Sequence, residues 1–372
     1  MTNPQMSHVP PPPFDRDTRP VVAMVRAPVF NASETFVRAQ ATGLVRYQPL
    51  IIGREDKGNI PPELIGRVLL GPGTERVRSF APVLVHAQFG TDGLRALPLA
   101  EWLGVPLITS LRGYEVSRSR SALLLSGRLS WMHYALRQRS LQRRGTLFLA
   151  VSEALRRQAI ARGYPGERTR THYNGVDLDR FPAGPGGSDD VLFVGRLVEK
   201  KGLETLLRAF ATVRRLRPET SLVIVGDGPL RSKLEKLAGE SVRFLGRLDS
   251  NAVAEWMRQA AVLAAPSVTA RDGDAEGLPN VVVEAAASAL PVVGTDHGGI
   301  PEAVVDGETG FIVPEGDAER LAARLLTILD SDDLRGRMGA AARRLAEQSF
   351  DFARQMQRLE AIYDEVRAGR CA

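Results

Sequence analysis

The sequence predicts an α/β protein with two doubly wound domains that face each other across a cleft. Short apolar runs rich in Val, Ile and Leu alternate with segments of helical periodicity in both halves of the 372-residue chain. Such runs are typical of parallel strands that are covered on both faces. A Gly/Pro-rich stretch without periodicity, FPAGPGGSDD at 181–190, separates the two halves. A chain of this length also suits two domains better than one.

The expected strands are evenly spread along the chain. Those of the first half are 20–27, 49–53, 83–87, 105–111 and 146–152. Those of the second half are 190–195, 221–226, 242–246, 262–266, 290–295 and 310–313. Helical periodicity is clearest at 202–217 and 318–330. Ligands of doubly wound sheets bind at the carboxyl ends of the strands, so we expect the functional site in the cleft.

These elements define the expected domains. The Pro-rich residues 1–18 are a disordered lead-in, and residues 19–181 form the first domain. Residues 182–190 are the linker, and residues 191–349 form the second domain. We expect a last helix, at about 350–369, to pack back on the first domain.

The composition predicts a soluble, reduced protein. Hydrophobic residues make up 44% and charged residues 25% of the chain, as in globular proteins. We find no apolar run near the ~18–20 residues that span a bilayer and no signal peptide, and we expect a cytoplasmic location. The single cysteine, Cys371, excludes a disulfide within the chain and a cysteine metal cluster.

The net charge of +6 is concentrated in arginine, most densely between residues 112 and 144, where Glu115 is the one acid. Leucines and Trp131 are interspersed with these arginines. Basic, apolar and aromatic residues together are typical of a helix on an anionic membrane surface. The alternative is a solvated helix whose apolar face belongs to the core. We expect peripheral association with the inner face of the plasma membrane.

A phosphate site is predicted where the strand at 190–195 ends. Arg196 follows this strand, and Lys200 and Lys201 precede Gly202 and the next helix. Cations beside a helix N-terminus at the carboxyl edge of a sheet favour anion binding. By itself this pattern is weak, because a Lys-Gly turn after a strand is often only a turn. No G-x-x-x-x-G-K-[ST] motif is present, which argues against an NTPase.

Two glutamates flank a second predicted helix start. Glu276 lies in a Gly/Pro-marked loop, and Glu284 lies in a helix expected over about 279–289, with Pro279 as its first residue. Carboxylates accept hydrogen bonds, and sugar hydroxyls donate them. Two acids around a phosphate-binding helix end therefore suit a nucleotide sugar. The alternative is a capping acid together with a buried acid that pairs with an arginine elsewhere.

Over nearly its whole length the chain resembles the retaining GT-B glycosyltransferases of family 4, which have two Rossmann-like domains. The resemblance rests on the E-x7-E spacing of Glu276 and Glu284, on the Arg–Lys pair upstream, and on the segments VGRLVEKKGLETLLRAF, LVIVGDGPLR, VRFLGR and EGLPNVVVEAAASALPVVGTDHGGIPEAVVDGETGFIV. It implies that Arg196 and Lys201 hold the donor diphosphate, that Glu276 contacts the donor sugar, and that Glu284 binds the ribose. The other donor-binding residues it implies are Gly195, Gly277, Leu278, Pro279, Asn280, Val281 and, at the base, Arg247 and Leu248.

The first half is similar to a narrower group, the transferases of bacterial exopolysaccharide assembly, such as those of colanic acid or amylovoran. The segments that carry this similarity are APVFNASETFVRAQ, VHAQFGTDG, SLRGYEVS and VSEALRRQAIARGYPGERTRTHYNGVDLDRF. They place the candidate acceptor-side residues at Ser33, Glu34, Thr35, His86, Arg112 and Asn174. Many relatives have a histidine where this chain has Arg112. His86 is then the histidine expected to reach the cleft, or else a structural histidine at a strand end.

The expected chemistry needs neither a metal nor a cofactor. Cations and a helix dipole stabilise the charge that grows on the leaving diphosphate, and this phosphate can accept the proton of the incoming hydroxyl. Asp272-Gly-Asp274 mimics a manganese-binding D-x-D motif, but we interpret these residues as acidic loop residues. Retention of configuration is implied by the resemblance only.

We therefore expect a hexosyltransferase-type enzyme that moves a sugar from a nucleoside-diphosphate sugar, of uridine, guanosine or adenosine, to a glycan or polyprenyl-linked acceptor. The alternatives on the same fold are a nucleotide-sugar epimerase and a sugar-nucleotide hydrolase. A two-lobed sugar-binding protein would have a signal peptide and would lack the predicted phosphate site. A nucleic-acid binder would need aromatic base platforms in a recognised module, and we expect no nucleic-acid partner.

Overall fold

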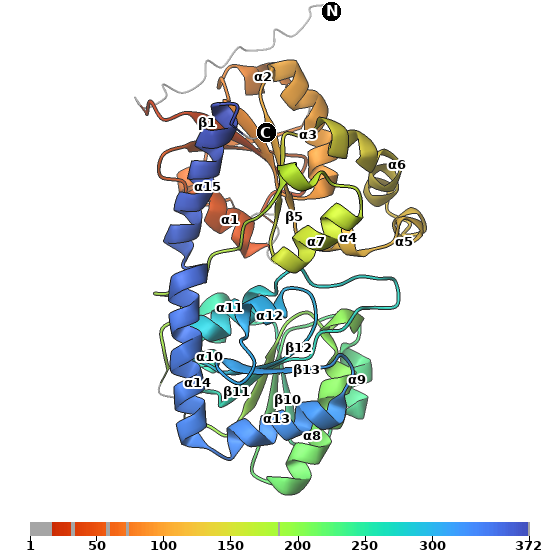
Figure 1. Cartoon of the computed structure of the whole chain (residues 1–372), viewed down its shortest axis with the longest axis vertical. Coiled ribbons are helices and arrows are strands. Elements are labelled where there is room, and N and C mark those ends of the chain that lie inside the picture. The colour runs from red at the N-terminus through yellow and green to blue at the C-terminus, as the bar shows by residue number, and fades with distance from the viewer. Residues whose placement is uncertain (1–16, 31–33, 57–59, 72–73, 185–186, 371–372) are drawn as a thin grey trace, which may run out of the picture.

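The computed structural model describes residues 17–30, 34–56, 60–71, 74–184 and 187–370. Two α/β domains lie one above the other, as Figure 1 shows. Most of the predicted lead-in, residues 1–16, and the predicted site residue Ser33 lie outside the described residues.

The N-terminal domain is built on a seven-stranded parallel sheet in the order β3-β2-β1-β4-β5-β6-β7. Its strands are β1 Val21–Val25, β2 Gln48–Gly53, β3 Val68–Leu70, β4 Leu84–Ala87, β5 Leu107–Leu111, β6 Leu147–Ala150 and β7 Thr169–Thr171. Its helices are α1 Thr35–Thr42, α2 Thr74–Arg78, α3 Gly90–Leu103, α4 Tyr114–Ser117, α5 Arg120–Leu124, α6 Leu129–Arg144 and α7 Glu153–Ala161. The central strands β4, β5 and β6 are buried at every position, which explains their continuous apolar character.

The C-terminal domain has a six-stranded parallel sheet in the order β10-β9-β8-β11-β12-β13. Its strands are β8 Val191–Val194, β9 Leu222–Val225, β10 Val242–Gly246, β11 Val262–Ala265, β12 Val292–Thr295 and β13 Gly310–Val313. The helices that follow are α8 Leu203–Leu216, α9 Arg231–Leu237, α10 Ser250–Gln259, α11 Asn280–Ala287, α12 Ile300–Ala303, α13 Ala318–Leu329, α14 Asp332–Leu345 and α15 Phe352–Arg367. The two sheets confirm the predicted pair of doubly wound domains.

The order of the strands reverses once in each sheet, between β1 and β4 and between β8 and β11. Loops diverge at such a point and leave a crevice at the carboxyl ends of the strands. The two crevices face each other across the domain boundary, and this arrangement positions the site.

The boundary between the domains differs from the expected one. Val176 and Phe181 are buried in a core cluster of the C-terminal domain, although both lie before the predicted linker. The chain therefore joins the second domain soon after β7. The segment 174–181 contains polar residues and a glycine, so hydrophobic periodicity does not reveal where the second domain begins.

The C-terminal helix α15 returns to the first domain, with α14 and α15 running along one side of the molecule (Figure 1). Met356, Leu359, Tyr363 and Val366 of α15 are buried in the core cluster that contains residues of β1 and α1. The buried carboxylate of Glu360 also accepts hydrogen bonds from the backbone N–H groups of residues 45 and 46. The last helix, α15, is therefore part of the core of the N-terminal domain.

Contacts between the domains concentrate on the loop around Gly277. Ser152 Oγ donates a hydrogen bond to the Gly277 carbonyl oxygen at 3.0 Å. A Cβ at Gly277 would lie 2.7 Å from the Arg112 carbonyl oxygen, so the close approach requires glycine. Glu302 of the second domain accepts hydrogen bonds from Glu153 and Ala154 N–H, both at 2.8 Å, and so caps the start of α7.

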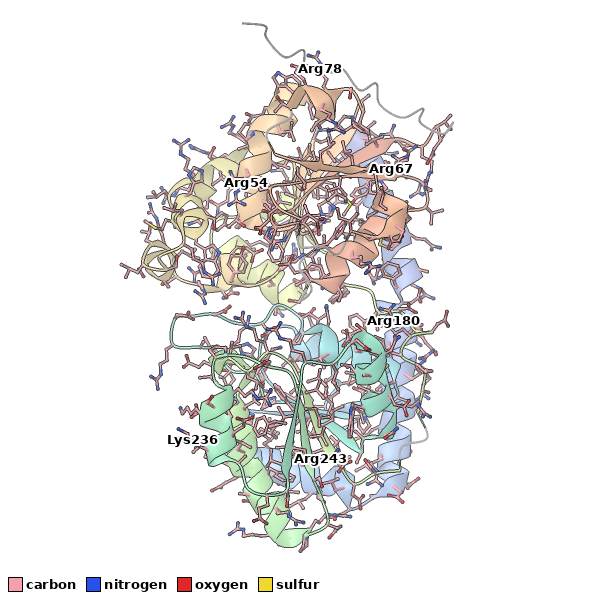
Figure 2. All side chains as sticks on the ribbon, turned by 180° about the vertical axis from the view of Figure 1, so that it is seen from behind. Arg54, Arg67, Arg78, Arg180, Lys236 and Arg243 are labelled. Atoms are coloured by element: carbon pink, nitrogen blue, oxygen red, sulfur yellow. The ribbon has the colours of Figure 1, made fainter. Side chains whose placement is uncertain are left out.

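The positive charge is spread over both domains. Figure 2 labels six cations, of which Arg54, Arg67 and Arg78 lie on the N-terminal domain and Lys236 and Arg243 on the C-terminal domain. These labelled cations do not line up in one stripe.

Candidate functional site

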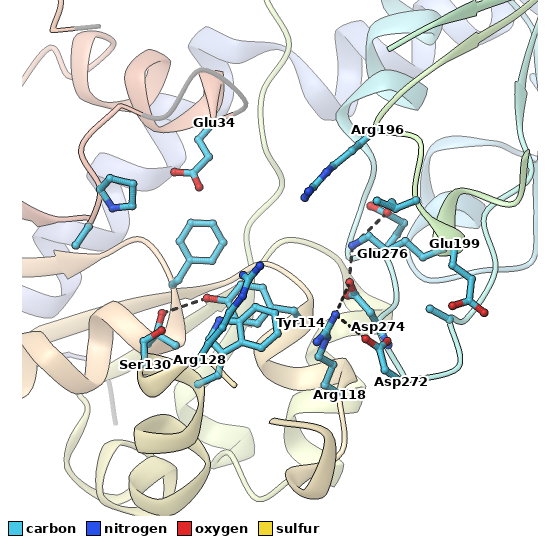
Figure 3. A pocket seen from close by; sticks show the side chains of 18 of the residues that line it. Glu34, Tyr114, Arg118, Arg128, Ser130, Arg196, Glu199, Asp272, Asp274 and Glu276 are labelled. Atoms are coloured by element: carbon cyan, nitrogen blue, oxygen red, sulfur yellow. Dashed lines mark hydrogen bonds and ion pairs between the residues drawn. The ribbon is translucent and has the colours of Figure 1, made fainter. Parts of the chain in front are cut away.

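A cavity of about 790 Å³ lies between the two domains where the strand orders reverse. The segments that line it follow β1, β4 and β5 in the first domain and β8 and β11 in the second. Figure 3 shows this cavity with acidic and basic side chains on both walls. Its charged lining comprises Arg26, Glu34, Arg95, Arg118, Arg128, Arg196, Glu199, Lys200, Lys201, Asp272, Asp274 and Glu276.

The wall formed by the C-terminal domain begins where β8 ends. Arg196 extends into the open space of the cavity (Figure 3), and its side chain has no hydrogen bond or ion pair within the described part of the chain. Lys200 and Lys201 end a short 3-10 turn, and Gly202 follows in the left-handed region with φ 67°. A Cβ at Gly202 would lie 1.8 Å from the Pro266 carbonyl oxygen, so this turn requires glycine. The Lys-Gly turn therefore presents both ammonium groups to the cavity.

Glu276 lies opposite these lysines. Its Oε1 is 3.3 Å from Lys201 Nζ and 3.4 Å from Lys200 Nζ. Burial disfavours the charged form of Glu276, but attraction to Lys201 and Lys200 outweighs it and lowers the pKa to about 2. The carboxylate is ionised at neutral pH, and its Oε1 has no hydrogen bond of good geometry. It can therefore accept a hydrogen bond from a ligand hydroxyl.

The loop that carries Glu276 is held by His297. The Glu276 N–H donates to His297 Nε2 at 3.0 Å, and His297 Nδ1 is 2.6 Å from a Glu315 carboxylate oxygen. Nε2 accepts and Nδ1 donates, which fixes the tautomer of this histidine. His297 is a positioning residue, and no sequence pattern around it indicates this role.

The helix α11 begins one residue later than predicted. Pro279 is its N-cap in an extended conformation, and Asn280 is the first helical residue. No side chain caps this end, so N–H groups of the first turn remain available to an anion. Leu278 is buried in the core of the second domain, and Val281 packs against that core.

Arg112 contributes to this helix end from the other domain. Its Nη1 donates to Asn174 Oδ1 at 2.8 Å, and Asn174 Nδ2 donates to Asn280 Oδ1 at 2.9 Å. The guanidinium group also bonds the backbone and side chain of Gln88 and lies 3.9 Å from the ring centroid of Phe36. Burial lowers the pKa of Arg112 to about 9. Arg112 thus positions Asn280 and does not line the cavity of Glu276.

Glu284 faces a second cavity, of about 480 Å³, on the other side of the start of α11. Thr35, Asn174, Arg180 and Ser250 share this lining. Burial raises the pKa of Glu284 to about 7, although Arg180 and Lys201 favour the charged form. The E-x7-E spacing therefore places one acid in each of two cavities separated by a helix end.

The candidate base contacts lie away from both cavities. Arg247 is exposed, and Leu248 packs against the core of the second domain. Ser250, which follows closely, does line the second cavity.

On the acceptor side, Glu34 lines the first cavity and pairs with Arg26 at 2.5 Å. Arg26 also contacts the buried Asp92 at 3.0 Å. Burial raises the pKa of Asp92 to about 6, against the attraction of Arg26. No motif in the sequence identifies Arg26 and Asp92, because they lie on separate segments that only the fold brings together.

The expectation that His86 reaches the cleft is wrong. His86 is fully buried, with Nδ1 2.7 Å from the Tyr363 hydroxyl and Nε2 2.9 Å from Ser110 Oγ. Burial, together with the charge of Arg112, lowers the pKa of His86 to about 3. Its position near the end of β4 suggested the cleft, but the side chain points to α15. His86 is a structural residue.

Asp272 and Asp274 line the first cavity and join its two walls. Arg118 Nη2 lies 2.8 Å from Asp272 and 3.3 Å from Asp274, and Lys200 Nζ also lies 3.3 Å from Asp274. Among the described residues, no group of three or more His, Cys, Asp or Glu side chains is arranged to hold a metal ion.

The stretch 112–144 does not form one surface. Arg112 is enclosed between the domains, and Trp131 stacks on Tyr114 with ring centroids 4.8 Å apart and lines the first cavity. Trp131, which the sequence placed among the residues of a membrane-surface helix, does not belong to such a surface, because its ring is engaged within the protein. Exposed apolar residues do remain at the α5–α6 corner and on α6: Leu125, Leu129 and Leu136. None of the described helices is long and apolar enough to cross a membrane.

Fold and site together define a two-domain protein with a phosphate-compatible cleft, and comparisons identify the family. Residues 177–345 match the model of glycosyl transferases group 1, and residues 50–180 match the model of glycosyltransferase family 4. The chain is 34% identical over 309 residues to WcaL of Escherichia coli K12, named as a colanic acid biosynthesis glycosyltransferase, covering 79% of this chain and 70% of that one. WcaL of Salmonella typhimurium is 35% identical over 272 residues, covering 70% of this chain and 65% of that protein.

The chain belongs to the family 4 glycosyltransferases. It spans about two thirds of the length of these WcaL relatives and 53% of the amylovoran biosynthesis glycosyltransferase AmsK of Erwinia amylovora, to which it is 31% identical over 55% of its own length. A crystal structure of HepE from Anabaena in complex with UDP and glucose superposes with a TM-score of 0.76 at 20% identity, covering 93% of this chain and all of that one. This likeness confirms the GT-B fold.

Proposed function

We propose that this protein transfers a sugar from a nucleoside-diphosphate sugar to a glycan or glycolipid acceptor in the assembly of a bacterial surface polysaccharide. The observation that carries the proposal is the wall formed by the C-terminal domain. There the unpaired Arg196, the Lys201 ammonium group and the ionised Glu276 face one cavity between the domains. Membership of the glycosyltransferase family and the relatives in colanic acid and amylovoran synthesis support it.

The donor diphosphate would bind Arg196, Lys201 and the N–H groups at the start of α11. Arginine offers a planar fork and lysine a mobile charge, and both suit phosphate oxygens. The sugar would then lie in the first cavity against Glu276. The ribose would lie in the second cavity, where Glu284 is the acceptor for its hydroxyls. UDP is the proposed nucleotide, since HepE was crystallised with it.

Binding of the diphosphate would also change the contacts of the Glu276 carboxylate. Without a donor, Lys201 and Lys200 neutralise this carboxylate. A diphosphate competes for the same lysines and leaves the carboxylate free to accept hydrogen bonds from the sugar. The ion pair thus keeps Glu276 charged in a buried place until the donor arrives.

In the reaction, the bond between the sugar C1 and the diphosphate oxygen breaks while the acceptor oxygen bonds to C1. Negative charge grows on the leaving oxygen, where Arg196 and Lys201 stabilise it. The leaving phosphate accepts the proton of the acceptor hydroxyl, so no protein base takes part. We propose that the acceptor attacks from the side of the leaving group, with retention of configuration. The cations supply the charge that a metal would otherwise provide.

The proposed location is the cytoplasmic face of the inner membrane, with peripheral association through α6. Exposed arginines, Arg137, Arg139 and Arg143, lie on this helix together with the exposed Leu129 and Leu136. This arrangement suits contact with anionic head groups.

The test is to incubate the protein with UDP-, GDP- and ADP-sugars and to measure donor hydrolysis and thermal shift. At least one donor should be hydrolysed slowly and should raise the Tm, and Arg196→Ala should weaken both effects. An absence of any shift with all three nucleotides would overturn the proposal. Free epimerised donor without an acceptor would support the epimerase instead.

A further inference from the structure

The charges around the first cavity are unevenly paired. Seven cationic and five acidic side chains line it. Arg26 pairs with Glu34, Arg118 with Asp272, and Lys200 and Lys201 with Glu276. Arg95 has a long contact of 3.6 Å to Asp92, and Glu199 pairs with Arg271 outside the cavity.

Two lining cations are left without an ion pair or a side-chain hydrogen bond in the described ranges. One is Arg196, on the wall formed by the C-terminal domain, where Arg196, Lys200, Lys201 and Glu276 line the cavity; we call this the donor wall. The other is Arg128, on the opposite wall, which belongs to the N-terminal domain (Figure 3). The proposed donor diphosphate accounts for Arg196. Arg128 lies on the opposite wall, and its guanidinium group remains available to a second anionic group.

Arg128 sits on an ordered aromatic platform. Phe89, Tyr114 and Trp131 stack in sequence, with centroid separations of 5.8 and 4.8 Å. Arg128 and Arg118 each lie over the Trp131 ring, at 4.6 and 4.4 Å from its centroid. A guanidinium group held over an indole face keeps its N–H edge free for an anion.

Arg118 provides a second, independent observation, an unsatisfied hydrogen-bond donor. Its Nη2 bonds the two aspartates of the other domain, but its Nε is buried and has no hydrogen-bond partner. A buried donor without a partner is costly, and a bound acceptor atom would satisfy it.

The same two arginines lie where the first cavity meets a smaller one of about 410 Å³. Arg118, Arg128, Trp131 and Asp272 line both cavities, while Ala122 and the exposed Leu125 line only the smaller one. A ligand that reaches the donor sugar from outside through this smaller cavity must pass the two guanidinium groups.

We propose that Arg128 and Arg118 over Trp131 form an anion-binding acceptor subsite, so that the acceptor carries a phosphate or carboxylate group beside the sugar it presents. This inference rests on the proposed function, since it places the acceptor opposite the proposed donor site. The anionic group has two possible sources, the phosphate that links a glycan to a lipid and the carboxylate of an acidic sugar.

The experiment is isothermal titration of the full chain, first with UDP and then, on the UDP-saturated protein, with two anionic probes. Geranyl diphosphate represents the lipid phosphate and methyl glucuronide the acidic sugar, with geraniol and methyl glucoside as their neutral counterparts. Saturation with UDP prevents the probes from occupying the donor wall. The variants are Arg128→Gln and, as a matched control, Arg157→Gln, an exposed arginine of α7 outside both cavities.

At least one anionic probe should bind about tenfold more tightly than its neutral counterpart, and Arg128→Gln should remove about tenfold of this affinity while Arg157→Gln does not. The probe that binds identifies the source of the anion. Failure of both probes, or equal affinity in the Arg128→Gln variant, would overturn the inference. The first titration separates this result from the proposed function, because UDP binding without probe binding contradicts only the acceptor subsite.

Discussion

The two walls of the cavity between the domains differ in how their charges are organised. On the wall of the C-terminal domain, lysines and Glu276 lie within one loop and one turn and neutralise each other at 3.3 to 3.4 Å. On the wall of the N-terminal domain, aromatic rings hold arginines that come from separate segments. The first wall combines two short motifs, around residues 196–202 and 272–276, which the fold brings together. The second wall holds Arg118 and Arg128 over the ring of Trp131, and this arrangement is visible only in the structure.

The largest effect is expected from removing the unpaired cation of the donor wall. Arg196→Ala should reduce transfer by roughly 2–4 kcal/mol of transition-state stabilisation, because a charge contact to the leaving diphosphate is lost. Initial rates at saturating donor measure this. Lys236→Ala, which removes an exposed cation of the same domain outside both cavities, is the matched control. Similar rates in the two variants would refute the role of Arg196.

The two glutamates should separate the two parts of the donor. Glu284→Gln should weaken binding of the bare nucleoside diphosphate about tenfold, since the ribose loses a charged acceptor. Glu276→Gln should leave that binding nearly unchanged and weaken binding of the intact nucleotide sugar. Calorimetric titration with both ligands compares them. Equal losses for both ligands in Glu276→Gln would show that Glu276 does not contact the sugar.

The same glutamates should affect stability in opposite directions. The pKa of Glu284 is about 7 when folded, above the ordinary 4.5, so the cost of ionising it develops as the pH rises from about 4.5 to 7 and is complete above 7. Glu284→Gln should therefore stabilise the free protein by about 1–3 kcal/mol at pH 8 and by little at pH 4.

The pKa of Glu276, about 2, lies below the ordinary 4.5. Its stabilising contribution is full above pH 4.5 and is lost as the pH falls toward 2, so Glu276→Gln should destabilise the protein at neutral pH. Thermal melts of both variants at pH 4 and 8 test this pair. A lower Tm for Glu284→Gln at pH 8 would contradict the burial of an ionised Glu284.

Smaller effects are expected from metal removal. EDTA should leave transfer unchanged, because Arg196, Lys200 and Lys201 supply the positive charge at the donor wall. The assay is repeated after dialysis and with added manganese. If EDTA abolished the activity and manganese restored it, the cations on this wall would not be sufficient to stabilise the leaving diphosphate without a metal.

The smallest effect concerns the outer face of the N-terminal domain. Changing Arg137, Arg139 and Arg143 together to Ser should weaken sedimentation with anionic vesicles at low salt by about 1 kcal/mol for each charge, and should leave transfer to a soluble acceptor unchanged. Neutral vesicles are the control. Unchanged sedimentation of the triple variant would show that α6 is a solvated helix that does not contact the membrane.

The difference between the walls also explains what the sequence could predict. Most strands were predictable because buried parallel strands are continuously apolar. The short edge strands β3 and β7 were not, since Thr169–Thr171 is polar and Val68–Leu70 is brief. The donor wall was predictable because its cations and acids lie in two short motifs. The partner of His86 on α15 and the contacts between Arg118 and the aspartates join residues more than 150 positions apart, and no local pattern encodes them.

The most direct test is a crystal structure of this protein with UDP and an unreactive sugar donor. We predict that the diphosphate lies within hydrogen-bond distance of Arg196 and Lys201, that the ribose contacts Glu284, and that the Glu276 carboxylate has left Lys201 to contact the sugar. A nucleotide bound outside the two cavities, or one whose diphosphate contacts neither Arg196 nor Lys201, would contradict the assignment of the donor wall.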